Sequence, residues 1–108
     1  MKVTNIEKIP YKEMRPGASV KFVHSDKMTF AFWEFQENTE LPEHSHPHEQ
    51  VVNILEGKLQ LTVDGDVHNL VAGDMLVIPP DVLHGAYAAE YCRALDTFCP
   101  VREDYLDN

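Results

Sequence analysis

The sequence predicts an all-β domain, a barrel or a sandwich, and three observations support this class. Apolar and polar residues alternate with a period of two over much of the chain, as they do in half-buried strands. Turn residues recur roughly every 6–12 residues and divide the chain into about eight short strands. The sequence shows no amphipathic helix of three turns. The 108 residues, 44% of them hydrophobic, suit one folded domain over residues 1–108.

The middle of the chain gives the clearest strand signals. Polar and apolar residues alternate over 58–63, and the Asp64-Gly65 pair that follows is a typical two-residue hairpin turn. Glu56-Gly57 marks a similar turn before this hairpin. A short apolar run over 75–78 ends at Pro79-Pro80, because proline cannot donate to a sheet ladder. The other strands expected in this part of the chain are residues 51–55, 66–70, 84–89 and 91–98.

An upstream strand over residues 28–35 is apolar on both faces. Phe30 and Phe32 share one face, and Ala31, Trp33 and Phe35 share the other. A barrel has a single interior, so one of these two faces needs a second cover. We expect that cover to be a twin chain in a two-fold homodimer, with residues 3–11 of the same chain as the alternative.

Charge and composition argue against several classes of protein. Nine basic and eighteen acidic residues give a net charge of −9, which repels nucleic-acid backbones. No apolar run approaches the ~20 residues that a membrane span needs, and the first residues lack the layout of a secretion signal. Cys92 and Cys99 match neither a redox pair nor a zinc spacing, so we expect two reduced thiols in a cytoplasmic protein.

Three of the six histidines crowd into residues 44–48. Residues two apart on a strand point to the same side, so His44 and His46 can present two imidazoles to one point. Gln50 has the same alternation, and His84 lies far downstream, after the Pro79-Pro80 turn. Imidazole is a common ligand of zinc, nickel, iron and copper, so this spacing is compatible with a metal site. A solvated polar loop is the alternative.

Two segments together resemble the paired motifs of the cupin superfamily. The first is His44-Ser45-His46-Pro47-His48-Glu49-Gln50 followed by six residues and Gly57, and the second runs over residues 73–84. The resemblance implies a single-domain jelly-roll β-barrel with one divalent transition ion, such as Zn, Ni, Fe or Mn. The ligands that it implies are His44, His46, Gln50 and His84.

The chain departs from the usual cupin pattern at two positions, with Gln50 in place of Glu and Asp81 in place of Gly. Three neutral imidazoles and an amide leave a divalent ion its full charge, which makes it a stronger Lewis acid. Glu49 is the alternative ligand, although the alternation points it away from the histidines. His48 is expected at the rim of the site, and His24 and His68 are expected at exposed polar positions.

Residues 91–98 carry a second group of interest. Cys92, Ala94, Asp96 and Phe98 share one face, and the small Cys92 and Ala94 suit a barrel interior. Burying a carboxylate is costly unless something pairs with it. An inward Asp96 beside a metal is suited to proton transfer. An outward Asp96, or one that caps a turn, is the alternative.

The end of the chain resembles that of pectin-degradation cupins of the KdgF type. The shared features are Asp96-x-Phe98, then Pro100 and Arg102, before an acidic-aromatic-Leu tail. That family converts 4,5-unsaturated uronic acids to linear 4-deoxy-5-keto uronates. The resemblance implies an enzyme with Asp96 as the acid/base, Phe98 packed on the sugar and Arg102 beside its carboxylate. A surface ion pair between Arg102 and Glu103 or Asp104 is the alternative.

Two other functions stay open from the sequence. Three histidines with open coordination positions also suit a mononuclear iron or copper dioxygenase. A cupin that only binds a sugar or a metal, without turnover, is the other alternative, because one fold hosts many functions. For the leading interpretation the expected partner is a small sugar acid, with no nucleic acid and no membrane.

Overall fold

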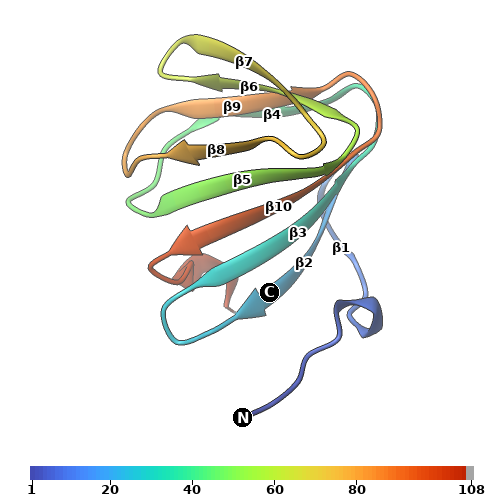
Figure 1. Ribbon diagram of the computed structural model, residues 1–108, viewed down its shortest axis with the longest axis vertical. Coiled ribbons are helices and arrows are strands. Elements are labelled where there is room, and N and C mark those ends of the chain that lie inside the picture. Colours follow the sequence, from blue (N-terminus) through green and yellow to red (C-terminus); the bar gives the residue numbers. More distant parts are fainter. Residues whose placement is uncertain (107–108) are drawn as a thin grey trace.

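In the computed structural model, which describes residues 1–106, ten strands form two antiparallel sheets (Figure 1). The strands are β1 (Lys12–Arg15), β2 (Ala18–His24), β3 (Thr29–Phe35), β4 (Thr39–His44), β5 (Glu49–Glu56), β6 (Lys58–Val63), β7 (Asp66–Val71), β8 (Met75–Ile78), β9 (His84–Ala88) and β10 (Cys92–Cys99). Two short 3-10 helices, η1 (Ile6–Lys8) and η2 (Glu103–Tyr105), lie near the ends of the chain. None of the described helices is long and apolar enough to cross a membrane.

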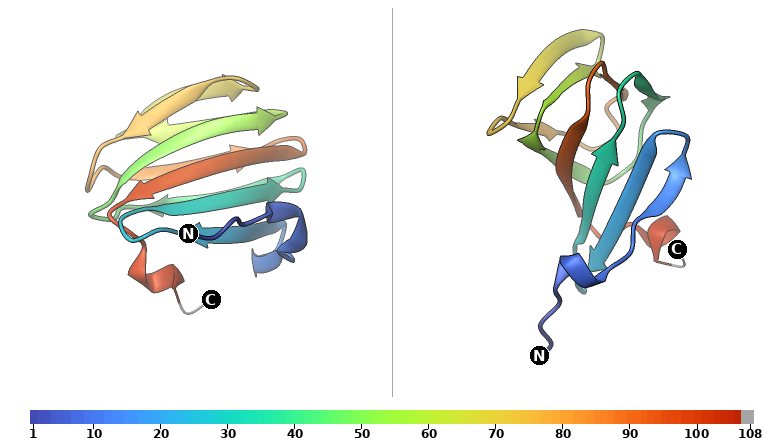
Figure 2. Two further views of the ribbon diagram at one scale, coloured as in Figure 1. Left: turned by 60° about the horizontal axis from the view of Figure 1, so that its bottom comes forward. Right: turned by 90° about the vertical axis from the view of Figure 1, so that its right-hand side faces the viewer.

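The chain crosses repeatedly from one sheet to the other. The larger sheet has the order β1-β2-β3-β10-β5-β8, and the smaller sheet has the order β4-β9-β6-β7. As a result β10, near the end of the chain, lies between β3 and β5 (Figure 1). Figure 2 shows η1 beside β2, where Lys21 Nζ donates to the carbonyl of Ile6 at 3.0 Å. The all-β class is therefore confirmed.

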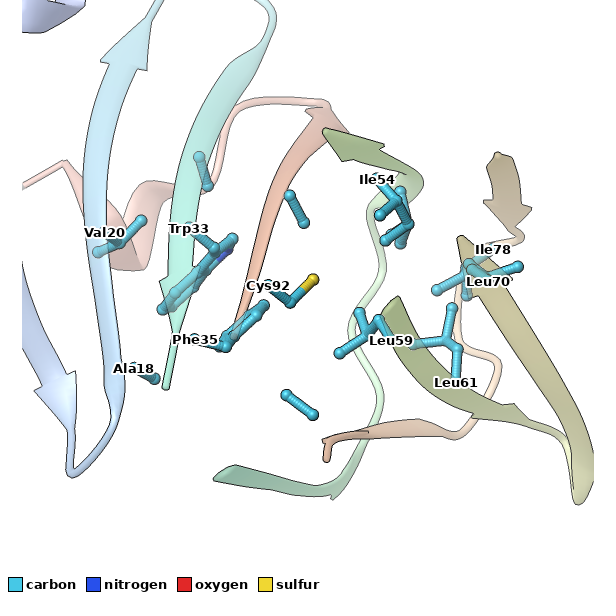
Figure 3. Packing of buried hydrophobic residues seen from close by; sticks show 14 of the residues in the cluster. Ala18, Val20, Trp33, Phe35, Ile54, Leu59, Leu61, Leu70, Ile78 and Cys92 are labelled. Atoms are coloured by element: carbon cyan, nitrogen blue, oxygen red, sulfur yellow. The ribbon is translucent and has the colours of Figure 1, made fainter. Parts of the chain in front are cut away.

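The core fills the space between the sheets. Figure 3 shows Trp33 and Phe35 of β3 on the same side of the sheet as Cys92, with Leu59 and Leu61 across the interior. The rings of Trp33 and Phe35 stack with centroids 5.5 Å apart. The buried apolar residues are Ala18, Val20, Ala31, Trp33, Phe35, Val52, Ile54, Leu59, Leu61, Leu70, Ile78, Ala88, Cys92, Ala94 and Phe98.

The two faces of β3 differ in burial. Its burial alternates strictly, with Ala31, Trp33 and Phe35 buried. Phe30 and Phe32 lie between them and are partly buried on the opposite face. The face that needs a second cover is therefore the one that carries the two phenylalanines.

The expected hairpin and the short strand after it lie where the sequence places them. Asp64 and Gly65 have φ values of 49° and 82°, and β6 pairs with β7 from Val63 opposite Asp66. Positive φ at both central residues is the geometry of a type I′ turn, whose twist matches that of the flanking strands. β8 covers residues 75–78 and ends before Pro79, as expected.

Candidate metal centre and cavity

The three histidines expected to bind a metal lie on three different segments of the chain. His44 ends β4, His46 lies in the loop of residues 45–48, and His84 begins β9. The expectation that His44 and His46 share one strand is therefore wrong, and Pro47 in this loop has no N–H for a ladder. Instead, the pairing of β4 with β9 sets His44 opposite His84.

The loop that carries His46 is tied to the second motif. The backbone N–H of Asp81 donates to the carbonyl of His46 at 2.8 Å. Asp81 has a φ of 64°, a left-handed conformation that Gly adopts freely and that Asp tolerates better than most residues. This explains how Asp can occupy a position where the cupin pattern has Gly.

The three imidazoles converge. One ring nitrogen of each of His44, His46 and His84 lies within 4.8 Å of the others. The ring centroids of His44 and His84 are 4.3 Å apart, and those of His46 and His84 are 4.9 Å apart. One ion at a metal–nitrogen distance of about 2.0–2.1 Å can reach all three with small side-chain movements.

Each ring is fixed through its other nitrogen. Nδ1 lies 2.9 Å from Pro42 O in His44, 3.1 Å from His48 O in His46 and 2.8 Å from Val82 O in His84. A carbonyl oxygen can only accept, so Nδ1 is the donor in each ring. In His44 and His84 this leaves Nε2 as the nitrogen that can bind a ligand. His84 Nε2 is buried without a hydrogen-bond partner among the described residues, which is costly unless a ligand such as a metal occupies it.

Burial also favours the neutral form of two of the rings, those of His46 and His84. Desolvation and, to a smaller degree, the charge of the nearby Arg102 guanidinium lower the pKa of His46 to about 4. The pKa of His84 is lowered as well, chiefly by desolvation. Neutral imidazole is the ligating form, so this set of donors fits a divalent transition ion.

Gln50 of β5 joins the histidines to Asp96 of β10. Its Oε1 lies 3.0 Å from His46 Nε2, and a hydrogen bond from its amide lowers the pKa of Asp96. Gln50 is buried whereas Glu49 is exposed. Of the two candidates at these positions, Gln50 is the one that lies beside the histidines.

Asp96 points inward rather than outward, and it lines a cavity between the sheets. Desolvation raises its pKa to about 7. The Gln50 amide, the Arg102 guanidinium and the Trp33 indole oppose this rise, because each favours the carboxylate. The Trp33 contribution is the smallest, and Nε1 of Trp33 makes no hydrogen bond of good geometry within the described chain.

The cavity has a volume of about 340 Å³, within the usual range of small-molecule sites. Its polar wall includes His44, Gln50, His84, Asp96 and Arg102. Its apolar wall includes Trp33, Phe35, Leu41, Val52, Leu59, Leu61 and Phe98. The groups suited to metal binding and to proton transfer therefore share one apolar enclosure.

Arg102 is 7% exposed and is held from two sides. Its Nε and Nη2 donate to the Asp104 carboxylate at 3.0 and 2.7 Å. Its guanidinium carbon lies 4.8 Å from the ring centroid of Phe98 and 4.2 Å from that of Tyr105. The ion pair with Asp104, considered above as the alternative, is thus present, and Arg102 lines the cavity as well.

The remaining histidines lie outside this cluster. His48 is partly buried, with its ring centroid 6.5 Å from that of Phe98. His24 and His68, expected to be exposed, are also partly buried, so that expectation is wrong. His24 stacks on Phe22, and its Nδ1 lies 2.8 Å from Thr29 Oγ1, a contact that alternation alone does not reveal.

Comparison with known proteins settles the family, because residues 31–98 match the cupin domain. The chain belongs to the cupin family. This cupin is 26% identical over 103 residues to the pectin degradation protein KdgF of Dickeya dadantii (strain 3937), covering 93% of this chain and 94% of that protein.

Two solved structures resemble this cupin over nearly its whole length. An RmlC-like cupin from Shewanella frigidimarina NCIMB 400 has a TM-score of 0.91 and 30% identity, covering 95% of this chain and 94% of that one. KdgF from Halomonas sp. has a TM-score of 0.89 and 26% identity, covering 93% and 94%. The cupin fold and the resemblance to KdgF are thereby confirmed.

Proposed function

We propose that this cupin is a metal-dependent enzyme that converts 4,5-unsaturated uronic acids to linear 4-deoxy-5-keto uronates. The observation that supports the proposal is the contact of Asp96 with Gln50, which in turn lies beside His46, so that a carboxyl and the histidine cluster share one cavity. The similarity to two KdgF proteins, one of them described as a pectin degradation protein, supports the choice of substrate.

The proposed ligands of one divalent transition ion are His44, His46, Gln50 and His84. The convergence of three imidazoles and the unpartnered Nε2 of His84 support this assignment. When bound, such an ion supplies Lewis acidity and a positive seat for the carboxylate or the ring-side oxygens of the sugar. Neutral protein ligands leave that charge undiminished.

The reaction is an isomerisation that moves one proton to carbon. The bond between C1 and the ring oxygen breaks as the C1 hydroxyl loses its proton and becomes an aldehyde. The oxygen released on C5 becomes a ketone as C4 gains a proton. We assign the delivery of the C4 proton to Asp96, and the proton lost from the C1 hydroxyl restores its acid form. Gln50 and Arg102 stabilise the carboxylate between these two events.

Two further residues position the sugar in this proposal. Phe98 is 3% exposed and contributes an apolar surface to the cavity, on which the ring can pack. Arg102 lies over the Phe98 ring and holds it in place, and it adds positive charge on the side of the histidines. The apolar wall lowers the local dielectric constant, which strengthens each charge interaction in the site.

The test substrate is unsaturated galacturonate made freshly with a pectate lyase. Metal-loaded protein is expected to remove the enol-ether absorbance faster than buffer does, without consuming oxygen, and protein stripped by a chelator is expected to lose this effect. Equal rates with and without protein would contradict the proposed activity. Oxygen uptake that matches substrate loss would favour the dioxygenase alternative instead.

The proposal includes a two-fold dimer through the outer face of the larger sheet. Strand pairing sets Phe30 beside Thr97, Thr97 beside Val51, and Val51 beside Val77. The outward Phe32 extends this apolar surface, and Val77 is 56% exposed. At one edge of this face, Lys21 of β2 donates to the carbonyl of Ile6 in η1. Light scattering at micromolar concentration is expected to report twice the mass of one chain, and a monomer would contradict the dimer.

The proposal also places the reaction in the cytoplasm. Cys92 and Cys99 lie at opposite ends of β10, and both are free thiols. Free thiols persist where the compartment is reducing. This location would be contradicted by recovery of the protein in a periplasmic or secreted fraction.

A further inference from the structure

We propose that Arg15 is a specificity-determining residue that binds the carboxylate of the sugar acid, on the cavity wall formed by β1 and β4. The inference rests on the proposed function and refines it, because it leaves the hydroxyl-bearing edge of the sugar, rather than the carboxylate, to face the histidine cluster.

A β-bulge turns Arg15 toward the interior. Glu13 pairs with Ser19, but the next residue paired on β1 is Arg15, opposite Ala18, so Met14 is the extra residue. Regular pairing would set Met14 opposite the inward-facing Ala18 and Arg15 on the outer side with Glu13. The bulge instead brings Arg15 to the inner side, and both Met14 and Arg15 line the cavity. Bulges of this kind re-aim side chains beside functional sites.

The turn that follows Arg15 is anchored to the start of β4. The carbonyl of Gly17 accepts from the backbone N–H of Gln36 at 2.8 Å and from Thr39 Oγ1 at 3.4 Å. Gly17 has a φ of 84°, and a Cβ there would collide with Thr39 Oγ1. This close approach holds the end of β1 near β4, whose Leu41 and Pro42 share the cavity wall with Arg15.

The two arginines of the cavity differ in their partners. The Arg102 guanidinium donates through Nε and Nη2 to both carboxylate oxygens of Asp104, so these two donors are occupied. Arg15 forms no ion pair within 4.0 Å and no side-chain hydrogen bond with residues 1–106. Glu43 lines the same cavity without pairing with it. Arg15 is therefore the guanidinium with donors free for a ligand.

The chemistry of the ligand follows from this charge. A guanidinium binds a carboxylate through two parallel hydrogen bonds, a geometry that neutral sugars cannot supply. The chain carries a net charge of −9, so an anionic ligand needs a local cation to overcome the general repulsion. Arg15 is exposed to solvent where it lines the cavity, so an entering sugar acid can reach it.

The position along the cavity separates Arg15 from the histidines. Gly17, two residues after Arg15, contacts Thr39 at the start of β4, whereas His44 lies at the far end of that strand and pairs with His84. A uronate bound with its carboxylate at Arg15 therefore presents its opposite, hydroxyl-bearing edge to the histidine cluster. Asp96 lines the same cavity and can address the carbons between these two ends.

Binding of D-galacturonate, a stable sugar acid, to metal-loaded protein tests this inference by calorimetry. Arg15→Gln is expected to raise the dissociation constant by about tenfold, the loss typical of charge-assisted hydrogen bonds at an accessible site. Arg15→Lys should restore part of the affinity. Arg93→Gln is the matched control: it removes the same charge from a pair with Glu56 that lies outside the cavity lining, and binding should not change.

Two outcomes would overturn the role of Arg15: equal galacturonate affinity in Arg15→Gln and wild type, or no galacturonate binding by wild type. Turnover of unsaturated galacturonate separates this inference from the proposed function. Arg15→Gln is expected to raise KM and to preserve most of kcat. If Arg15→Gln turns over as fast as wild type with an unchanged KM, the role of Arg15 is rejected and the proposed reaction stands. Galacturonate binding that depends on Arg15, without any turnover, would reject the proposed reaction alone.

Discussion

The two halves of β10 share one face of one strand and differ in their chemistry. Cys92 and Ala94, in the first half, are 0% and 1% exposed and belong to the core. Asp96 and Phe98, in the second half, line the cavity. Burial raises the pKa of the Cys92 thiol to about 11 and that of the Asp96 carboxyl to about 7.

The neighbours of each half explain the difference. Around Cys92, the charges of Asp96, Glu90 and Glu56 add to the effect of burial, so every named influence holds the thiol protonated. Around Asp96, a neutral amide and a guanidinium oppose burial, so both protonation states are accessible near neutrality. Burial alone holds a titratable group in its neutral form. Burial together with a few polar partners keeps the pKa near neutrality, where the group can both donate and accept a proton.

Removal of a histidine has the largest expected effect, because it would remove the ion that we propose acts together with Asp96 in the second half of β10. Protein as purified is expected to carry about one divalent ion per chain, and His84→Ala is expected to lose most of it. Glu49→Ala is the control and should keep the metal, since Glu49 is exposed beside the buried Gln50. Elemental analysis measures both, and full metal in His84→Ala would contradict the ligand assignment.

Thiol labelling tests the first half of β10, where Cys92 is buried, and its expected effect is smaller. At pH 8 a disulfide reagent should modify Cys99, which is exposed, within minutes. Cys92 should react only after unfolding, because the thiolate is the nucleophile and a pKa of about 11 keeps it scarce. Mass spectrometry of the labelled chain reads out each site. Labelling of both thiols at the same rate in the native protein would show that the first half of β10 is accessible.

The sequence predicts the middle of the chain better than its first third. The strands after residue 48 alternate clearly and end at Gly or Pro, and the structure places them within a residue or two of their expected bounds. β1, β2 and β4 are absent from the prediction. β1 is exposed at all four positions, and β4 contains Pro42, so neither shows the alternation that marks a half-buried strand.

The candidate site was accessible to sequence reasoning only in part. The motifs identify the histidines, but alternation misplaces His46, because β4 ends at His44 and His46 lies in the loop that follows. The pairing that sets His44 opposite His84 joins distant residues and leaves no local pattern in the sequence. The place of Trp33 beside Asp96 depends on the register of β3 with β10. Arg15 was missed because a bulge is a property of pairing, and a single chain does not display it.

Asp96→Asn, assayed beside wild type on unsaturated galacturonate with the metal content of each protein determined, tests the central claim most directly. The substitution keeps the shape of the side chain and removes its acid, so fold and metal content should not change. The rate above spontaneous opening is expected to fall by about 10²–10⁴-fold. Asp26→Asn, at an exposed turn, is the control and should keep the wild-type rate. A fully metal-loaded Asp96→Asn variant that turns over as fast as wild type would contradict the assignment of the proton to Asp96.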